Sequence, residues 1–167
     1  MRLMKTVICP GSFDPVTNGH LDIIERSARL FDKVIVVVMK NPSKSNFCFT
    51  PEERAELIKR CIGDIKNVEV DIYGGLLAEY ARQKGAVAVV KGLRALSDFE
   101  YEFQQAQINK KLNSELETIF INTRMENMYL SSSTVKQVCE LGGDISDFVP
   151  EEIRDDIVKR IKRGADK

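Results

Sequence analysis

The stretch VICPGSFDPVTNGH, residues 7–20, is the part of the sequence around which the rest of the chain is organised. The short β-branched run at residues 6–9 indicates a buried strand. The pair Pro10-Gly11 is unfavourable in a strand ladder and predicts a turn directly after it. A helix is predicted after Asn18-Gly19, because apolar residues then recur at helical spacing, at Leu21, Ile24, Ala28 and Phe31. The stretch therefore predicts a strand, a polar turn and a helix in immediate succession.

The predicted turn has the features of a phosphate site. The N-terminus of a helix offers free backbone N–H groups and the positive end of its dipole, and both favour an anion. Gly11 and Gly19 have no Cβ, so we expect that a ligand can come close to the backbone there. His20, the only histidine of the chain, is expected in the first helical turn near the same point. The spacing alone is equally consistent with an ordinary connection in which His20 satisfies a local hydrogen bond.

The composition indicates a single domain, residues 1–167. The 25 Lys and Arg residues balance the 25 Asp and Glu residues, so no overall field attracts a polyanion and we expect no nucleic-acid partner. The four cysteines lack the spacing of a zinc site. Free thiols in a reducing compartment are therefore expected. No apolar run is long enough for a signal peptide or a membrane span, so we expect a cytoplasmic protein without a membrane partner.

Strand-like and helical segments alternate along the chain. Further strands are predicted at residues 34–39, 68–73, 86–90 and 118–121, and further helices at residues 51–61, 76–84, 98–113, 131–141 and 150–163. This alternation predicts an α/β fold with a doubly wound, five-stranded parallel sheet and C-terminal helices. Ligands bind such sheets outside the carboxyl ends of the strands. The candidate side chains that follow predicted strand ends are Ser12, Lys44, Lys91 and Arg94.

Motifs that the sequence lacks narrow the functional classes. It contains no GxxxxGK[ST] and no GxGxxG after a strand, which argues against a P-loop protein and against the usual dinucleotide-binding fold. It also contains no GxSxG. A hydrolase triad would have to use His20, which opens a helix directly after the first strand and is poorly placed for a triad base.

The residues GSFDP (11–15) and TNGH (17–20) resemble the nucleotidyltransferases of the HxGH superfamily, with Thr17 in the place of the first histidine. The TNGH form is similar to the phosphopantetheine adenylyltransferase branch, whose members make dephospho-coenzyme A from ATP and 4′-phosphopantetheine. DFEYE (98–102) and LSSS (130–133) match further elements of that branch, with Leu for Ile in the second. KGLR (91–94) departs from the family's RGLR, because lysine keeps the charge but loses the planar fork of arginine. The resemblance spans residues 6–150 and implies a Rossmann-like nucleotidyltransferase fold.

The resemblance also implies roles for individual residues. Catalysis would depend on His20, which stabilises the transition state, together with Lys44 and Arg94. ATP would be bound by Ser12, Phe13, His20, Gly92, Leu93, Arg94, Glu102, Asn127, Met128, Tyr129, Leu130, Ser131, Ser132 and Ser133. The acceptor would be bound by Ser12, Lys44, Leu77 and Lys91. Mg²⁺ would enter with ATP, with no metal site in the protein. The family implies a homohexamer with coenzyme A as a feedback ligand.

Each of these elements has a plainer interpretation as well. Lys44 and the KGLR segment are consistent with solvated loop charges, and the serines with an ordinary helix cap. In the helix at 98–113, a polar stripe formed by Asp98, Glu102, Gln105 and Asn109 could be a solvated face. The apolar stripe of Phe99, Phe103 and Ala106 is expected to pack in the core.

Two other functions stay open from the sequence. One is a nucleotidyltransferase of the same superfamily that uses nicotinate mononucleotide, or CTP with an alcohol phosphate; the DFEYE and LSSS elements argue against it. The other is a non-catalytic nucleotide-sensing module on the same sheet. Pyrophosphate release with different acceptors distinguishes the three.

Overall fold

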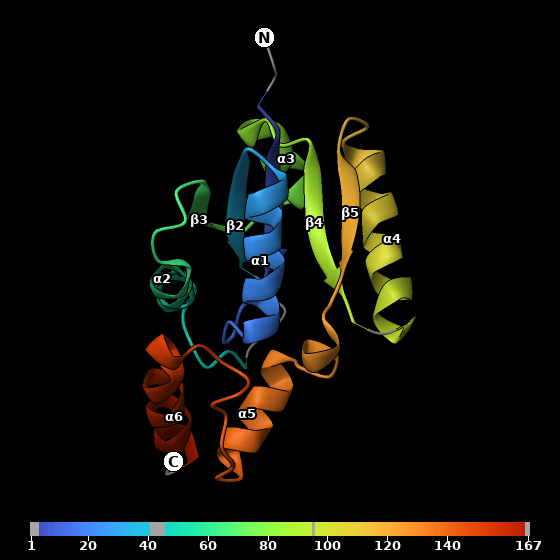
Figure 1. Cartoon of the computed structure of the whole chain (residues 1–167). Coiled ribbons are helices and arrows are strands. Elements are labelled where there is room, and N and C mark those ends of the chain that lie inside the picture. The colour runs from blue at the N-terminus through green and yellow to red at the C-terminus, as the bar shows by residue number, and fades with distance from the viewer. Residues whose placement is uncertain (1–3, 41–45, 95, 166–167) are drawn as a thin grey trace.

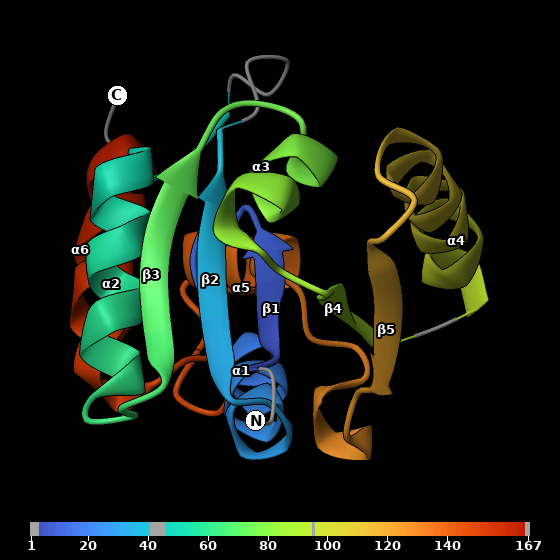
Figure 2. The same cartoon turned by 90° about the horizontal axis from the view of Figure 1, so that it is seen from above.

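Five β-branched segments form one parallel sheet in the computed structural model, which describes residues 4–40, 46–94 and 96–165. The strands are β1 (Thr6–Gly11), β2 (Lys33–Met39), β3 (Val68–Tyr73), β4 (Ala88–Leu93) and β5 (Glu117–Asn122). Their order in the sheet is β3-β2-β1-β4-β5. The chain thus runs outward from β1 to one edge and then returns to β4 on the other side of β1. Figure 2 shows this doubly wound arrangement, which confirms the predicted fold class.

Helices cover both faces of the sheet. They are α1 (Asn18–Leu30), α2 (Pro51–Ile62), α3 (Leu77–Lys84), α4 (Leu96–Leu112), α5 (Ser132–Glu140) and α6 (Glu151–Ala165), with a short 3₁₀ turn, η1 (Met125–Asn127), after β5. α1, α2, α5 and α6 contribute to one apolar cluster and α3 to a second one. α4 lies beside the edge strand β5 (Figure 1). In the part of the chain that the structure describes, no helix has the length and apolarity needed to cross a membrane.

Alternation along the strands explains the two clusters. Val34, Val36 and Val38 of β2 belong to the larger cluster, whereas Ile35 and Val37 belong to the smaller one. Successive side chains of a strand point to opposite faces, so a continuous apolar run is what a sheet buried on both sides requires.

The sheet separates between β1 and β4 at its carboxyl edge. β1 pairs with β4 only at Val7 and Ile8, while its pairing with β2 continues to Gly11, opposite Val38. The prediction that β1 stops before Pro10-Gly11 is therefore wrong, because the ladder with β2 continues through both residues. This separation lies where the strand order reverses, which is the place where α/β sheets of this kind bind ligands.

β4 is also displaced from its predicted span of 86–90. It begins at Ala88 and continues to Leu93, so Lys91, Gly92 and Leu93 are strand residues paired with Phe120, Ile121 and Asn122 of β5. The charged segment expected in a loop is thus held in register by the neighbouring strand.

Candidate active site

A cavity of about 190 Å³ opens between the carboxyl ends of β1 and β4. Its walls come from β1, the β1–α1 turn, α1, β4, α4 and the segment after β5. The residues that line it are Cys9, Pro10, Gly11, Phe13, Thr17, Gly19, His20, Ile23, Ile24, Val90, Lys91, Gly92, Arg94, Glu102, Thr123, Asn127 and Leu130. The cavity therefore brings together His20, Lys91, Arg94 and Glu102, which are far apart in the sequence.

His20 has two functions in the first turn of α1. Thr17 is the N-cap of the helix, and its side chain accepts a hydrogen bond from the His20 backbone N–H. In return, the Thr17 backbone N–H donates to His20 Nδ1 at 3.0 Å. This is a capping box in which histidine takes the place usually held by glutamate or glutamine. Because Nδ1 accepts a hydrogen bond, the proton of the neutral ring resides on Nε2.

The protonation state of His20 follows from its surroundings. Burial, together with the positive charges of Arg94 and Lys91, lowers the pKa of the imidazole to about 4. The ring is therefore neutral at physiological pH, with Nε2–H as its donor. A neutral donor beside two cations can stabilise a negatively charged group without giving up its proton.

Phe13 fixes the turn that precedes α1. Its backbone lies in the left-handed region with φ of 50°, and its ring is 4% exposed. The ring contacts the His20 ring edge-on, with 5.1 Å between centroids. It also fills the space beside Gly11, where a Cβ would lie 2.9 Å from the Phe13 ring. Gly11 is thus required for the packing of Phe13, which in turn supports the imidazole.

Lys91 in β4 and Arg94 directly after it are each paired with a carboxylate of α4. Lys91 Nζ lies 3.1 Å from Glu102, and Arg94 Nε lies 3.1 Å from Asp98. Arg94 also donates to the carbonyl oxygen of Leu130 at 2.6 Å. Asp98 and Glu102 are one helical turn apart, so they present both carboxylates to the cations. The side chain of Glu102 is only 19% exposed, which shows that this part of the polar stripe is not a solvated face.

The apolar stripe of α4 is not in the core, contrary to the prediction. Phe99 is 43% exposed and Phe103 is 47% exposed, although their rings stack on one another with 5.7 Å between centroids. The reason is that α4 lies beside the last strand of the sheet (Figure 2), where Phe99 contacts Phe120 of β5 with 6.2 Å between ring centroids, so the stripe lies at the margin of the sheet and not in the core. Helical periodicity identifies an apolar face but does not tell what covers it.

Other residues from the resemblance lie around the cavity or away from it. Phe13, Gly92, Asn127 and Leu130 line it. Met128 and the exposed Tyr129 follow η1 without being among the lining residues, and Leu93 ends β4. Leu77 packs against the smaller apolar cluster, with Ile8 and Ala78. Lys44 lies outside the described residues.

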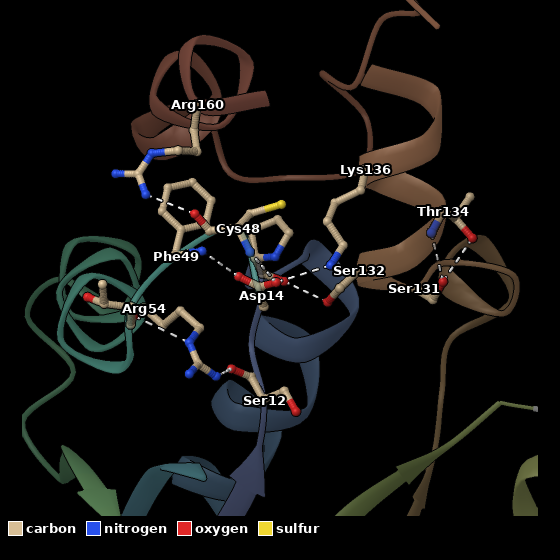
Figure 3. A network of polar contacts seen from close by, with 12 residues as sticks. Ser12, Asp14, Cys48, Phe49, Arg54, Ser131, Ser132, Thr134, Lys136 and Arg160 are labelled. Carbon is tan, nitrogen blue, oxygen red and sulfur yellow. Dashed lines mark hydrogen bonds and ion pairs between the residues drawn. The ribbon is translucent and has the colours of Figure 1, made fainter. Parts of the chain in front are cut away.

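The serines and Ser12 are held by other contacts (Figure 3). Ser131 caps α5, accepting from the Thr134 backbone N–H at 3.0 Å. Ser132 Oγ donates to the carbonyl oxygen of Pro15 at 2.7 Å, and Ser133 is exposed. The carbonyl oxygen of Ser12 accepts from Arg54 Nη1 at 2.7 Å. These contacts join α5 and α2 to the turn before α1.

Several lining residues belong to no motif and could not be identified from the sequence. Cys9 is buried, and burial raises the pKa of its thiol to about 11. The side chain therefore contributes an uncharged surface to the wall of the cavity. Ile23 and Thr123 are ordinary residues of a helix and a connection, and only the fold brings them to the cavity. Thr17 could have been recognised as an N-cap, because a hydroxyl three residues before a ring nitrogen fits the capping-box spacing.

The parallel sheet, the reversal point and a cavity with a neutral imidazole and two cations are consistent with a nucleotidyltransferase, and the comparisons with known proteins show that class. The family described as cytidylyltransferase-like matches residues 8–138. The fold is shared with a bifunctional NMN adenylyltransferase/ADP ribose pyrophosphatase from Francisella tularensis, at a TM-score of 0.71 and 15% identity over 96% of this chain and 50% of that one. It is also shared with a putative nicotinate-nucleotide adenylyltransferase from Vibrio parahaemolyticus, at a TM-score of 0.66 and 19% identity over 95% and 96% of the two chains.

Similarity of sequence is much higher to a narrower group. The chain is 53% identical to the phosphopantetheine adenylyltransferase of Caldanaerobacter subterraneus subsp. tengcongensis, over 96% of this chain and 100% of that protein. It is 56% identical to the protein of that name from Alkaliphilus metalliredigens, over 89% and 94% of the two chains. With the one from Clostridium tetani, identity is 51% over 94% and 98%. The chain belongs to the phosphopantetheine adenylyltransferase family.

Proposed function

We propose that this protein transfers the adenylyl group of ATP to 4′-phosphopantetheine, giving dephospho-coenzyme A and pyrophosphate. The observation that carries the chemistry is the hydrogen bond from the Thr17 backbone N–H to His20 Nδ1, because it leaves Nε2–H as a fixed donor beside Lys91 and Arg94. The name shared by the relatives supports the choice of acceptor.

The reaction needs no general base. The second pKa of a phosphate monoester is about 6, so the acceptor is largely dianionic at neutral pH. One of its oxygens attacks the α-phosphorus of ATP, and the bond from that phosphorus to the oxygen that bridges to the β-phosphorus breaks as pyrophosphate leaves. In-line positioning and neutralisation of the developing charge supply the catalysis. His20 would donate to the α-phosphate, and Lys91 and Arg94 would neutralise charge on the transferred and leaving groups.

Mg²⁺ would arrive on the phosphates of ATP. The ion is usually held by one or two carboxylates together with substrate phosphates. Among the described residues that line the cavity, Glu102 is the one carboxylate, and it is paired with Lys91. No group of three His, Cys, Asp or Glu residues suited to a metal occurs in the described part of the chain. We therefore propose that the ion is held by the phosphates of ATP and that it neutralises part of their charge.

Pyrophosphate release with a panel of acceptors tests this function. We expect release from ATP with 4′-phosphopantetheine and none with nicotinate mononucleotide, nor from CTP with an alcohol phosphate. A preference for one of the other acceptors would reassign the substrate. Tight ATP binding without release from any acceptor would identify a nucleotide-sensing module instead.

Self-association and feedback complete the proposal. Phe99 and Phe103 of α4 are exposed and their rings stack on one another, and exposed aromatic side chains of this kind are typical of an interface. We therefore propose that this face of α4 makes contacts within a homohexamer. Separately, we propose that coenzyme A binds on the acceptor side of the cavity as an inhibitor. Light scattering of the wild type and of Phe103→Ser tests the first assignment, and inhibition by coenzyme A tests the second.

A further inference from the structure

Asp14, in the turn before α1, is almost completely buried and is the centre of a polar network outside the cavity. The residue is 3% exposed, and both of its carboxylate oxygens are in use. Oδ1 accepts from the backbone N–H of Phe49 at 2.9 Å. Oδ2 accepts from the backbone N–H of Cys48 at 2.9 Å and from Lys136 Nζ at 3.1 Å. One side chain thus joins three segments of the chain, as Figure 3 shows.

Of the three joined segments, the turn before α1 lines the cavity, and the other two are held against that turn. The turn at 12–17 leads directly to Thr17 and His20. The segment at 46–50 follows β2 and leads into α2. Lys136 lies on α5, the helix that begins at the serine cluster. The position of each segment relative to the imidazole therefore depends on the same carboxylate.

Further contacts hold the same three segments together. Ser132 of α5 donates to the carbonyl oxygen of Pro15, beside Asp14. Arg54, which is 1% exposed, donates to the Ser12 carbonyl oxygen, and its guanidinium lies 4.2 Å from the centroid of the Phe47 ring.

The C-terminal helix adds a contact from the other side. Arg160 of α6 donates to the Cys48 carbonyl oxygen at 2.8 Å, and its guanidinium lies 4.7 Å from the centroid of the Phe49 ring. The segment at 47–49 is thus fixed by Asp14, by α2 and by α6. These contacts restrict the segment at 47–49 and, through Asp14, the turn that precedes His20.

We propose that Asp14 and Lys136 are positioning residues for adenylyl transfer: their ion pair and the Asp14 amide contacts align the turn, the 46–50 segment and α5 around the reacting groups. This inference rests on the proposed function. It differs from a role in which Lys136 binds phosphate directly, because in this structure the ammonium is committed to a buried carboxylate. A misplacement of about 1 Å can cost about 10²-fold in rate, so the loss should fall on kcat more than on KM.

The test compares four variants in the pyrophosphate assay. Asp14→Asn keeps the shape of the side chain but removes the charge, and Lys136→Met removes the ammonium while leaving Asp14 its two amide donors. The double variant and Lys136→Arg complete the set. We expect kcat to fall about 10²-fold in Asp14→Asn and about tenfold in Lys136→Met, with KM for both substrates within about threefold of the wild type. The double variant should be no worse than Asp14→Asn, because coupled residues are not additive, and Lys136→Arg should recover most of the activity.

A matched control is the surface ion pair between the half-buried Lys33 and the exposed Glu69, 2.8 Å apart at the opposite edge of the sheet. Lys33→Met should leave kcat and KM unchanged. Hydrogen exchange of the Cys48 and Phe49 amides, measured without substrate, should be faster in Asp14→Asn. This readout does not depend on which acceptor is used, so it separates failure of the positioning role from failure of the proposed function, which the wild type alone tests.

Three results would overturn the proposal. If Lys136 binds phosphate directly, Lys136→Met raises KM for ATP while Asp14→Asn, which frees the ammonium, lowers it. If the network is only structural, the variants melt at lower temperature but keep wild-type kcat well below their melting points. Additive losses in the double variant would show that the two residues act independently. Should Asp14→Asn not fold, Lys136→Met and Lys136→Arg still distinguish a loss in kcat from a change in KM.

Discussion

Replacement of His20 by alanine separates its role in the helix from its role in the reaction. The change removes the Nε2–H donor, and loss of one such donor typically lowers kcat by about 10²–10³-fold. It also removes the Nδ1 acceptor of the capping box, and loss of a cap typically costs about 1 kcal/mol of stability. For a chain of this length, that corresponds to a fall in melting temperature of about 2–4 °C. Pyrophosphate release and thermal unfolding measure the two losses independently.

A second substitution at the same position provides the matched control. His20→Glu restores the side chain that a capping box usually has at this place, and an anion near a helix N-terminus is favourable. We expect it to melt at or above the temperature of the alanine variant while showing no turnover, because its charge repels the phosphates. If kcat of His20→Ala stays within about threefold of the wild type, or if the glutamate variant is active, His20 is not the transition-state donor.

Three further predictions follow from the described contacts. Asn127 is 8% exposed and lines the cavity, and its carboxamide has no hydrogen bond among the described residues. We therefore expect Asn127→Leu to raise KM for ATP about tenfold, which is the equivalent of one hydrogen bond. Thermal unfolding of the variant is the control. The pKa of His20 is lowered to about 4, so protonation of this residue should not reduce kcat between pH 6 and 8. The unfolded state binds the proton at a higher pH than the folded state, so the free energy of unfolding falls as pH drops from about 6.5 toward 4. In urea titrations, His20→Ala should lack that part of the acid sensitivity. Hydrogen bonds, chiefly from Arg160, lower the pKa of Glu53 to about 2. The pair therefore contributes stability above about pH 4.5, and this contribution is lost as pH falls toward 2. Arg160→Met should lower the urea midpoint at pH 7 and lower it much less at pH 2.5.

The fold was predictable because burial on both faces leaves a strong pattern. β2 reads as a continuous β-branched run, and the helices carry caps such as Thr50 with Glu53, which the structure confirms as a capping box. The limits of β1 and β4 were not predictable, because they depend on the neighbouring strand. Pro10 stays in the ladder since β2 continues beside it, and Lys91 is a strand residue since β5 runs alongside.

The candidate site was partly predictable for a similar reason. The GSFDP and TNGH motifs are continuous in sequence, so their turn and His20 could be located directly, and Lys91 and Arg94 followed from the rule about strand ends. The contacts of Ser132 with Pro15 and of Asp14 with Lys136 join residues more than a hundred positions apart. Such pairs depend on tertiary packing, so a serine cluster before a helix does not reveal which hydroxyl remains available.

The pairing of Lys91 with Glu102 and of Arg94 with Asp98 means that the cavity brings its own counter-ions. A nucleotide that reaches these cations takes part in an ion exchange within the protein, in which phosphate oxygens compete with the carboxylates of α4. A polyphosphate carries several anionic groups along its length, so it could replace both carboxylates at once. Such a replacement would break both ion pairs that join α4 to β4 and its C-terminal end, so it would couple the position of the helix to the arrival of a nucleotide.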